Sequence, residues 1–143
     1  MRTSLLLALL LSLPLPAAPW EQSPPLFKGQ DLEGWTSTDM DLWSVQDGAI
    51  VGSSEKDIPH NVFLWSPVEV GDFYLQIDVR ITPDNRNAGI QFRSTVHPTN
   101  PKEALGYQAD IGKGVWGCLY HESGRKILDW RGLARDAVKP EEW

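Results

Sequence analysis

Ten residues in the middle of the chain alternate between apolar and polar side chains. The odd positions of segment 73–82 are all apolar, from Phe73 to Ile81, and the even positions carry polar side chains or Tyr74. Successive side chains of a β-strand point to opposite faces, so this alternation predicts a strand with one buried face. No part of the chain has a sustained helical period, which favours a fold made of strands.

Other short segments have the same character. Trp43–Val45 and Ala49–Val51 flank an Asp47-Gly48 pair, which is typical of a tight β-hairpin. Further strands are expected at Val62–Trp65, Ala88–Ser94, Leu105–Ile111, Trp116–Tyr120 and Lys126–Trp130. Many short strands at close spacing within 143 residues predict one all-β domain, either a sandwich or a barrel.

The N-terminus has the pattern of an export signal. A short positive start precedes an apolar run at Leu5–Leu13, which is too short to span a bilayer, and small residues follow at Ala17–Ala18. A buried helix is the poorer alternative, because prolines end the run. We therefore expect a signal peptide over 1–18, a linker over 19–25 and a folded domain over 26–143, in an exported protein that is periplasmic or extracellular.

Composition argues against several kinds of partner and site. The net charge is −6 and Lys and Arg form no cluster, so no nucleic-acid partner is expected. No second long apolar segment follows the first, so no membrane contact is expected after signal cleavage. The single cysteine, Cys118, is predicted to be a small buried residue rather than a nucleophile. The three histidines are scattered, and no metal site is predicted.

Two of the predicted strands gather polar groups on one face. In Ile90–Arg93 the alternation puts Gln91 and Arg93 together, and in Tyr107–Ile111 it puts Gln108 and Asp110 together. A guanidinium, a carboxylate and two amides on one side of a sheet suit a ligand with many hydroxyl groups. A sugar is therefore the first ligand to consider.

Each of these residues also has a purely structural interpretation. Arg93 and Asp110 can form a cross-strand ion pair on a solvated face, which contributes little to stability. Gln108 can be an ordinary solvated strand residue, and Trp116 and Tyr120 can be packing residues rather than walls of a binding site.

Six ordered pieces of the sequence resemble a known family, the 3-keto-disaccharide hydrolase domain. They are Leu26–Trp35, Trp43–Gly52, Gly71–Leu75, Asn87–Arg93, Gly106–Gly112 and Trp116–Tyr120. The resemblance implies a concanavalin-like jelly roll, a sandwich of two antiparallel sheets with its ligand on the concave face. Two departures stand out: Ala88 occupies a position where the family usually has Ser, and family members continue for several strands beyond the position of Trp143. We therefore expect the last strands of the sandwich to be missing.

The resemblance also implies a chemistry, the cleavage of glycosides that carry a ketone at C3. The ketone acidifies the C2 proton, a base removes it, the C1 substituent leaves, and water can then add, so the reaction is a lyase step or a net hydrolysis. We assign Asp110 as the candidate base, Arg93 as the stabiliser of the enolate or carbonyl, and Glu122 as the alternative base. Candidate substrate-binding residues are Asn87, Gln91, Gln108, Trp116 and Tyr120.

A second function is compatible with the same scaffold, namely a non-catalytic carbohydrate-binding module. Fold does not separate the two, because one scaffold hosts many functions. The sequence names no cofactor and leaves the linkage and anomer of the glycoside open.

Overall fold

The computed structural model describes residues 23–83, 85–130 and 143, and its regular structure is almost entirely β. One sheet is a hairpin of two antiparallel strands, and the other has four antiparallel strands in the order β3-β4-β5-β6. The strands are β1 (Trp43–Gln46), β2 (Ala49–Gly52), β3 (Asn87–His97), β4 (Asn100–Gly112), β5 (Leu119–Glu122) and β6 (Lys126–Asp129). One short 3-10 turn, η2 (Met40–Leu42), precedes β1. The prediction of an all-β fold with two antiparallel sheets is confirmed, as a jelly-roll sandwich requires.

The hairpin β1–β2 forms where the Asp-Gly pair predicts it. Gln46 pairs with Ala49 across the turn. Asp47 and Gly48 have φ values of 50° and 77°, so both lie in the left-handed region that a two-residue hairpin turn needs. Local chemistry therefore fixes this hairpin.

The long hairpin of β3 and β4 is the scaffold of the larger sheet. Its register sets Gly89 opposite Asp110 and Gln91 opposite Gln108. A β-bulge interrupts it after Phe92, where Arg93 and Ser94 together stand opposite one residue of β4. Arg93 has a φ of 48°, the left-handed conformation that such a bulge uses. Strict alternation along β3 therefore ends at this point.

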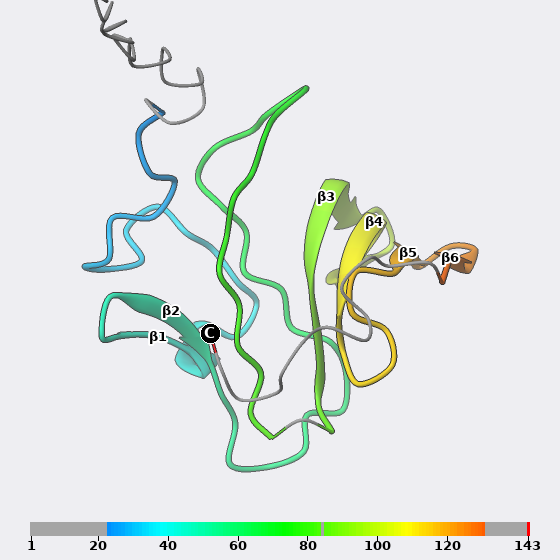
Figure 1. The fold of residues 1–143 in the computed structure, drawn as a ribbon, viewed down its shortest axis with the longest axis horizontal. Helices are drawn as coiled ribbons and strands as arrows, with labels where there is room; N and C mark the ends of the chain where they lie inside the picture. Colours follow the sequence, from blue (N-terminus) through cyan, green and yellow to red (C-terminus); the bar gives the residue numbers. More distant parts are fainter. Residues whose placement is uncertain (1–22, 84, 131–142) are drawn as a thin grey trace, which may run out of the picture.

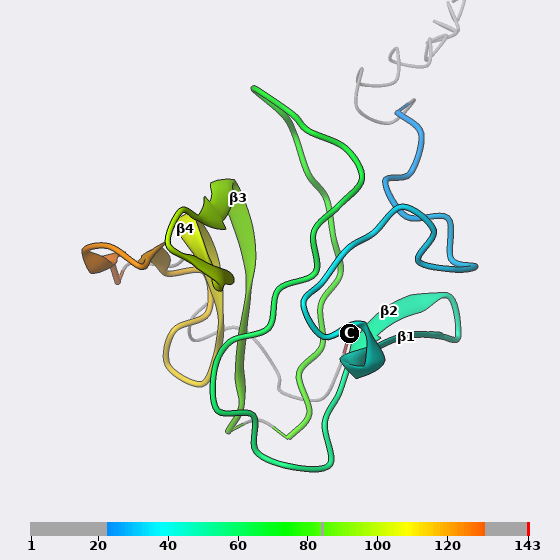
Figure 2. The ribbon, with the colours of Figure 1, turned by 180° about the vertical axis from the view of Figure 1, so that it is seen from behind.

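The alternating segment 73–82 lies between the two sheets without joining either. Figure 1 and Figure 2 show it in green, between the β1–β2 hairpin and the β3–β6 sheet. It is extended but forms no ladder, so the predicted strand is wrong in this structure: a strand needs a partner in register, and no described segment supplies one. The strand predicted at Val62–Trp65 is likewise reduced to one bridge, between Thr36 and Trp65.

The core of the larger sheet is small. Ile81, at the end of the alternating segment, packs against Ile111 and Trp116, and all three are buried. Val79 and Ile90 cover this cluster from the side. The end of segment 73–82 at Ile81 is therefore anchored in this core.

Trp116 lies in a turn rather than in a strand. The amide of Val115 donates to the carbonyl of Gly112 at 3.0 Å and that of Cys118 to the carbonyl of Val115 at 2.9 Å. These tight turns delay the strand predicted over Trp116–Tyr120 until Leu119. The prediction for the last strand agrees with β6.

Two further predictions concern segments outside the described residues or their edges. The signal peptide over 1–18 and most of the linker over 19–25 lie outside the part that the structure describes, and these boundaries stay predictions. In the described part, no helix is long and apolar enough to cross a membrane.

Candidate functional site

One face of β3, β4 and β5 gathers the polar side chains that the sequence singled out. Residues directly opposite each other in a sheet share a face, and Gln91 is opposite Gln108, which is opposite Tyr120. We call this the polar face. It comprises Asn87, Gln91, Gln108, Asp110 and Tyr120.

A row of hydrogen bonds crosses the polar face and ends on a carboxylate. The amide of Gln91 donates from Nε2 to Oε1 of Gln108 at 3.0 Å, and Gln108 donates from Nε2 to Oδ1 of Asp110 at 3.4 Å. At the other end, Oγ of Ser94 lies 2.9 Å from Oε1 of Gln91, in position to donate to it. We call these four residues the polar ladder. A carboxylate only accepts hydrogen bonds, so Asp110 sets the direction of the whole row.

Asp110 is buried, with 6% of its surface exposed, and its two oxygens differ. Besides Gln108, Nδ2 of Asn87 donates to Oδ1 at 2.8 Å and the amide of Ile111 donates to it at 3.1 Å. Asn87 also donates to the carbonyl of Ile111 at 3.2 Å, which fixes its own position. In the described part of the chain, no hydrogen bond is shown on Oδ2. The carboxylate is thus held in place through Oδ1.

Two glycines make room for the ladder. A Cβ on Gly89 would overlap the side-chain amide of Gln108, and one on Gly106 would overlap Oγ of Ser94. Both glycines lie in the β3–β4 hairpin, where any side chain would displace Gln108 or Ser94 of the polar ladder. The packing of the polar face therefore depends on the missing side chains as much as on the polar ones.

Arg93 is not brought to Asp110, contrary to the prediction. Its Nη2 pairs with Oδ1 of Asp72 at 2.7 Å, and both side chains are largely exposed. The cross-strand ion pair between Arg93 and Asp110, the structural alternative, is absent from the described contacts as well. The reason is the bulge, since an inserted residue breaks the alternation from which the common face was inferred. Ser94 bonds to Gln91 instead.

Glu122 lies at the end of β5, apart from Asp110. It is opposite Gly106, four residues before Asp110 on β4, which corresponds to roughly 13 Å along the strand at about 3.3 Å per residue. Burial raises the pKa of Glu122 above its ordinary value of 4.5, although Lys126 and a hydrogen bond from Asn61 at 3.5 Å oppose this. The two candidate bases therefore belong to different places on the sheet.

The aromatic candidates have different environments. Trp116 is buried in the core with Ile81 and Ile111, which matches the packing interpretation rather than a wall that a ligand can reach. Tyr120 is partly exposed on the polar face, and Nζ of Lys126 lies 6.0 Å from its ring centre. Cys118 is fully buried, and its thiol donates to the carbonyl of Trp130 at 3.5 Å.

Sequence reasoning missed two residues of the site, Ser94 and Asn61. Strict alternation assigns Ser94 to the apolar face, and only the bulge changes this. Asn61 lies in the loop before Val62. The same loop contains Asp57, whose Oδ1 lies 3.1 Å from Nη1 of Arg86, next to the start of β3. No sequence pattern indicates this approach.

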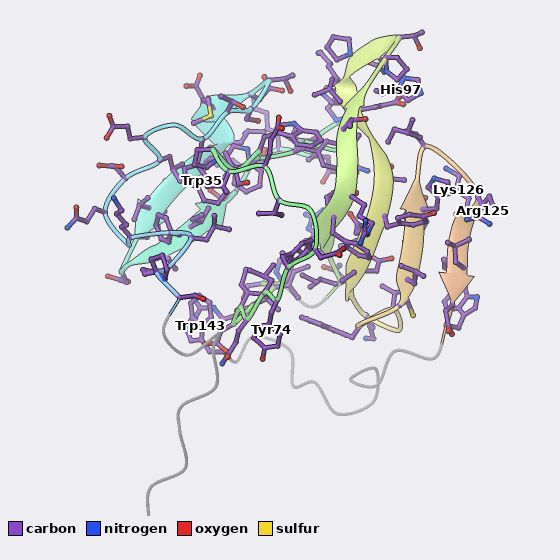
Figure 3. The ribbon with its side chains drawn as sticks, turned by 90° about the horizontal axis from the view of Figure 1, so that it is seen from above. Trp35, Tyr74, His97, Arg125, Lys126 and Trp143 are labelled. Atoms are coloured by element: carbon purple, nitrogen blue, oxygen red, sulfur yellow. The ribbon has the colours of Figure 1, made fainter. Side chains whose placement is uncertain are left out.

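Cationic and imidazole side chains at the rim of the sheet are separate from the ladder. Figure 3 shows His97 at the far end of β3, and Arg125 and Lys126 at the turn between β5 and β6. Among the described residues, no group of three or more His, Cys, Asp or Glu side chains is placed to hold a metal ion.

Comparison with known proteins identifies the family but no individual relative. No curated protein matches the chain, and no solved structure does. One family model matches residues 22–143, and it describes a 3-keto-alpha-glucoside-1,2-lyase-like domain. The match covers most of the chain and agrees with the resemblance seen in its short pieces. The chain therefore belongs to the family of 3-keto-alpha-glucoside-1,2-lyase-like domains.

Proposed function

We propose that this protein is an enzyme that cleaves 3-keto-glycosides by removing the C2 proton. Family membership supports a carbohydrate-active protein of the 3-keto-disaccharide hydrolase type. The observation that carries the catalytic assignment is the environment of Asp110. Three donors converge on its Oδ1, while no described hydrogen bond is shown on Oδ2, so the carboxylate has one oxygen for support and one for chemistry.

The reaction balances in three steps. Oδ2 of Asp110 takes the proton from C2, and the electrons of that C–H bond form the C2–C3 double bond of an enolate. The enolate then returns its electrons: the C3 carbonyl re-forms, C1 and C2 become doubly bonded, and the C1–oxygen bond breaks. The aglycone oxygen takes up a proton and leaves as an alcohol, and Asp110 gives up the proton from C2, directly or through solvent, to become a carboxylate again. Water adds across C1 and C2 to complete a net hydrolysis, or the unsaturated ketone is released as the product of a lyase.

The ladder prepares Asp110 for the first step. Each amide of the row directs its N–H end toward the carboxylate, which fixes the position of the carboxylate on the polar face. The second N–H of Gln108 and the phenol of Tyr120 are on the same face, where they can donate to sugar oxygens. Arg93 can act as enolate stabiliser only after its guanidinium leaves Asp72.

The substitution Asp110→Asn tests the assignment. The amide keeps the size of the side chain but cannot take a proton, so turnover of a 3-keto-glucoside should fall about 100- to 10,000-fold. Release of the aglycone measures turnover, and calorimetric titration with the same ketone measures binding, which should remain. Unchanged turnover would remove Asp110 from the mechanism.

Two matched variants sharpen the result. If Glu122→Gln abolishes turnover while Asp110→Asn does not, the alternative base is the correct one. If neither variant changes turnover and the wild type binds the sugar without cleaving it, the protein is the carbohydrate-binding module.

The place of action follows from the N-terminal pattern. We propose that the signal over 1–18 directs the protein out of the cytoplasm. Outside the cytoplasm, the protein meets glycosides that are already oxidised at C3. Detection of a chain beginning near residue 19 in the periplasm or medium tests the export step.

A further inference from the structure

The side-chain amides of Gln91 and Gln108 have more donors than the polar ladder uses. A primary amide carries two N–H groups. Nε2 of Gln91 donates one of them to Oε1 of Gln108, and Nε2 of Gln108 donates one to Oδ1 of Asp110. Among the described residues, no further acceptor is shown for either nitrogen. Each amide therefore keeps one N–H group for a ligand.

Burial makes the remaining donor of Gln108 unfavourable unless it has a function. Gln108 is only 8% exposed. A buried N–H group without an acceptor has lost its bonds to water and gained none, so folded proteins keep few such groups, and a catalytic role is one reason for keeping them. Gln91 and Tyr120, directly opposite Gln108 on either side, are partly exposed and give a ligand an approach to the polar face.

The two donors are close enough to meet on one oxygen atom. Oε1 and Nε2 of one amide are bonded to the same carbon and are at most about 2.6 Å apart. Nε2 of Gln91 lies 3.0 Å from Oε1 of Gln108, so the two nitrogens are at most about 5.6 Å apart. An oxygen that accepts two N–H bonds of about 2.9 Å can join nitrogens up to about 5.8 Å apart. The pair can therefore bind a single carbonyl oxygen.

A carbonyl oxygen held there lies beside the candidate base. Nε2 of Gln108 is 3.4 Å from Oδ1 of Asp110. In a 3-keto-glycoside the acidic C2 proton and the C3 oxygen are on adjacent carbons, so a base and its donors must be neighbours. When the proton leaves, the electrons of the C–H bond form the C2–C3 double bond and those of the carbonyl move onto the oxygen, which then accepts both N–H bonds more strongly than the ketone did.

We propose that Gln91 and Gln108 together bind the C3 oxygen and stabilise the enolate, which is the role that the sequence assigned to Arg93. The inference rests on the proposed function, because it concerns the same site and the same step. Neutral donors suit this position, since a guanidinium so close to Asp110 would form an ion pair with the carboxylate instead of binding the substrate.

Hydrogen exchange at C2 tests the amide pair apart from the later steps. The probe is a 3-keto-glucose analogue with hydrogen in place of the oxygen substituent at C1, so it has the acidic proton but no aglycone to lose. Nuclear magnetic resonance in heavy water follows the loss of its C2 proton signal. Gln91→Met keeps the length of the side chain without its N–H groups, and exchange should slow about 100- to 1,000-fold while the half-saturating concentration changes little.

Three further variants separate donation from packing. Gln91→Glu adds a negative charge where the enolate forms and should slow exchange more than Gln91→Met does. Ser94→Ala removes the hydroxyl beside Gln91 but leaves both N–H groups, so exchange should slow only a few-fold. Gln46→Met is the matched control and should change nothing, because Nε2 of Gln46 donates to Oγ of Ser44 at 3.0 Å in the other sheet.

The outcomes distinguish this role from the proposed function. Exchange that the wild type does not catalyse, or that Asp110→Asn leaves unchanged, would overturn the proposed function and this role with it. Exchange that requires Asp110 but is unaffected by Gln91→Met would overturn this role alone, and so would a variant that binds the probe more weakly but exchanges it at the full rate. Circular dichroism confirms that each variant is folded, and Gln91→Glu decides the question if Gln91→Met is not.

Discussion

The polar face and segment 73–82 share one sequence pattern and have opposite structures. Both alternate, and both offer an apolar row with a polar row behind it. On the polar face, β3 and β4 pair over most of their length, so the side chains Gln91, Gln108 and Asp110 are held in one row of hydrogen bonds. In segment 73–82 the same alternation is present without a ladder to any described segment, and most of its side chains stay exposed, whereas Ile81 at its end is buried. Alternation defines the two faces of a strand, but only pairing turns those faces into a core and a site.

The largest expected difference between the two regions is at the anchored end of the segment. Ile81→Ala removes a buried side chain and should lower the free energy of unfolding by about 2–5 kcal/mol. Ile77→Ala, four residues earlier and 52% exposed, should lower it by less than about 0.5 kcal/mol. Urea unfolding measures both, and equal losses would mean that the exposed half of the segment is in fact packed.

Two glycine substitutions compare how much room for a side chain there is in the two regions. Gly89→Ala pushes a methyl group into the amide of Gln108 and should cost about 1–3 kcal/mol in stability, with a loss of turnover as Gln108 leaves Asp110. Gly71→Ala, at the start of the unpaired region, meets nothing within 4 Å and should change neither quantity. A tolerated Gly89→Ala with full activity would show that the ladder is dispensable.

A serine pair tests the far end of the ladder. Ser94→Ala removes the hydroxyl that supports Gln91 and should cost about 1 kcal/mol and a few-fold in turnover, with the Michaelis constant little changed. Ser66→Ala is the matched control, because its hydroxyl donates to the carbonyl of Val68 at 2.9 Å in the exposed region. If both serines prove neutral for turnover, the ladder acts no further than Gln108.

The smallest effect concerns pH. Burial raises the pKa of Glu122 above 4.5, so the folded state holds this proton more tightly than the unfolded state does. The resulting stability is present below pH 4.5 and is lost as the pH rises through the folded-state value. Relative to the wild type, Glu122→Gln should therefore be slightly more stable at pH 7, by less than about 0.5 kcal/mol, since much of the side chain remains solvated. That advantage should vanish on acidification, and an advantage that grows instead would mean that the pKa is lowered.

Much of the fold was predictable because local chemistry determines it. Asp47-Gly48 specifies a hairpin by itself, and the alternation in β3 and β4 places Gln91, Gln108 and Asp110 on one face without any tertiary information. The bulge at Arg93 was not predictable, because nothing in that residue type demands a left-handed conformation. Its consequence is that Ser94, and not Arg93, bonds to Gln91.

Two other features depend on contacts between distant parts of the chain. The approach of Asn61 to Glu122 joins residues 61 positions apart, and no local signal encodes it. Segment 73–82 forms no ladder with the described segments, and this depends likewise on what lies beside it, whereas sequence alternation reports only which way its own side chains point. The face of a strand on which a side chain lies could be inferred from the sequence, whereas the distant segments that it contacts could not.

The one-way direction of the ladder makes Gln91 a reporter of the state of Asp110. While Asp110 is ionised it can only accept, so Gln108 and then Gln91 are each confined to a single rotamer of the terminal amide. An amide at position 110 can itself donate, so in Asp110→Asn both glutamine amides gain the freedom to turn over together. The side-chain amide resonances of Gln91 should then shift or broaden, although Gln91 lies two hydrogen bonds away from the substituted group, and nuclear magnetic resonance can detect this without any substrate present.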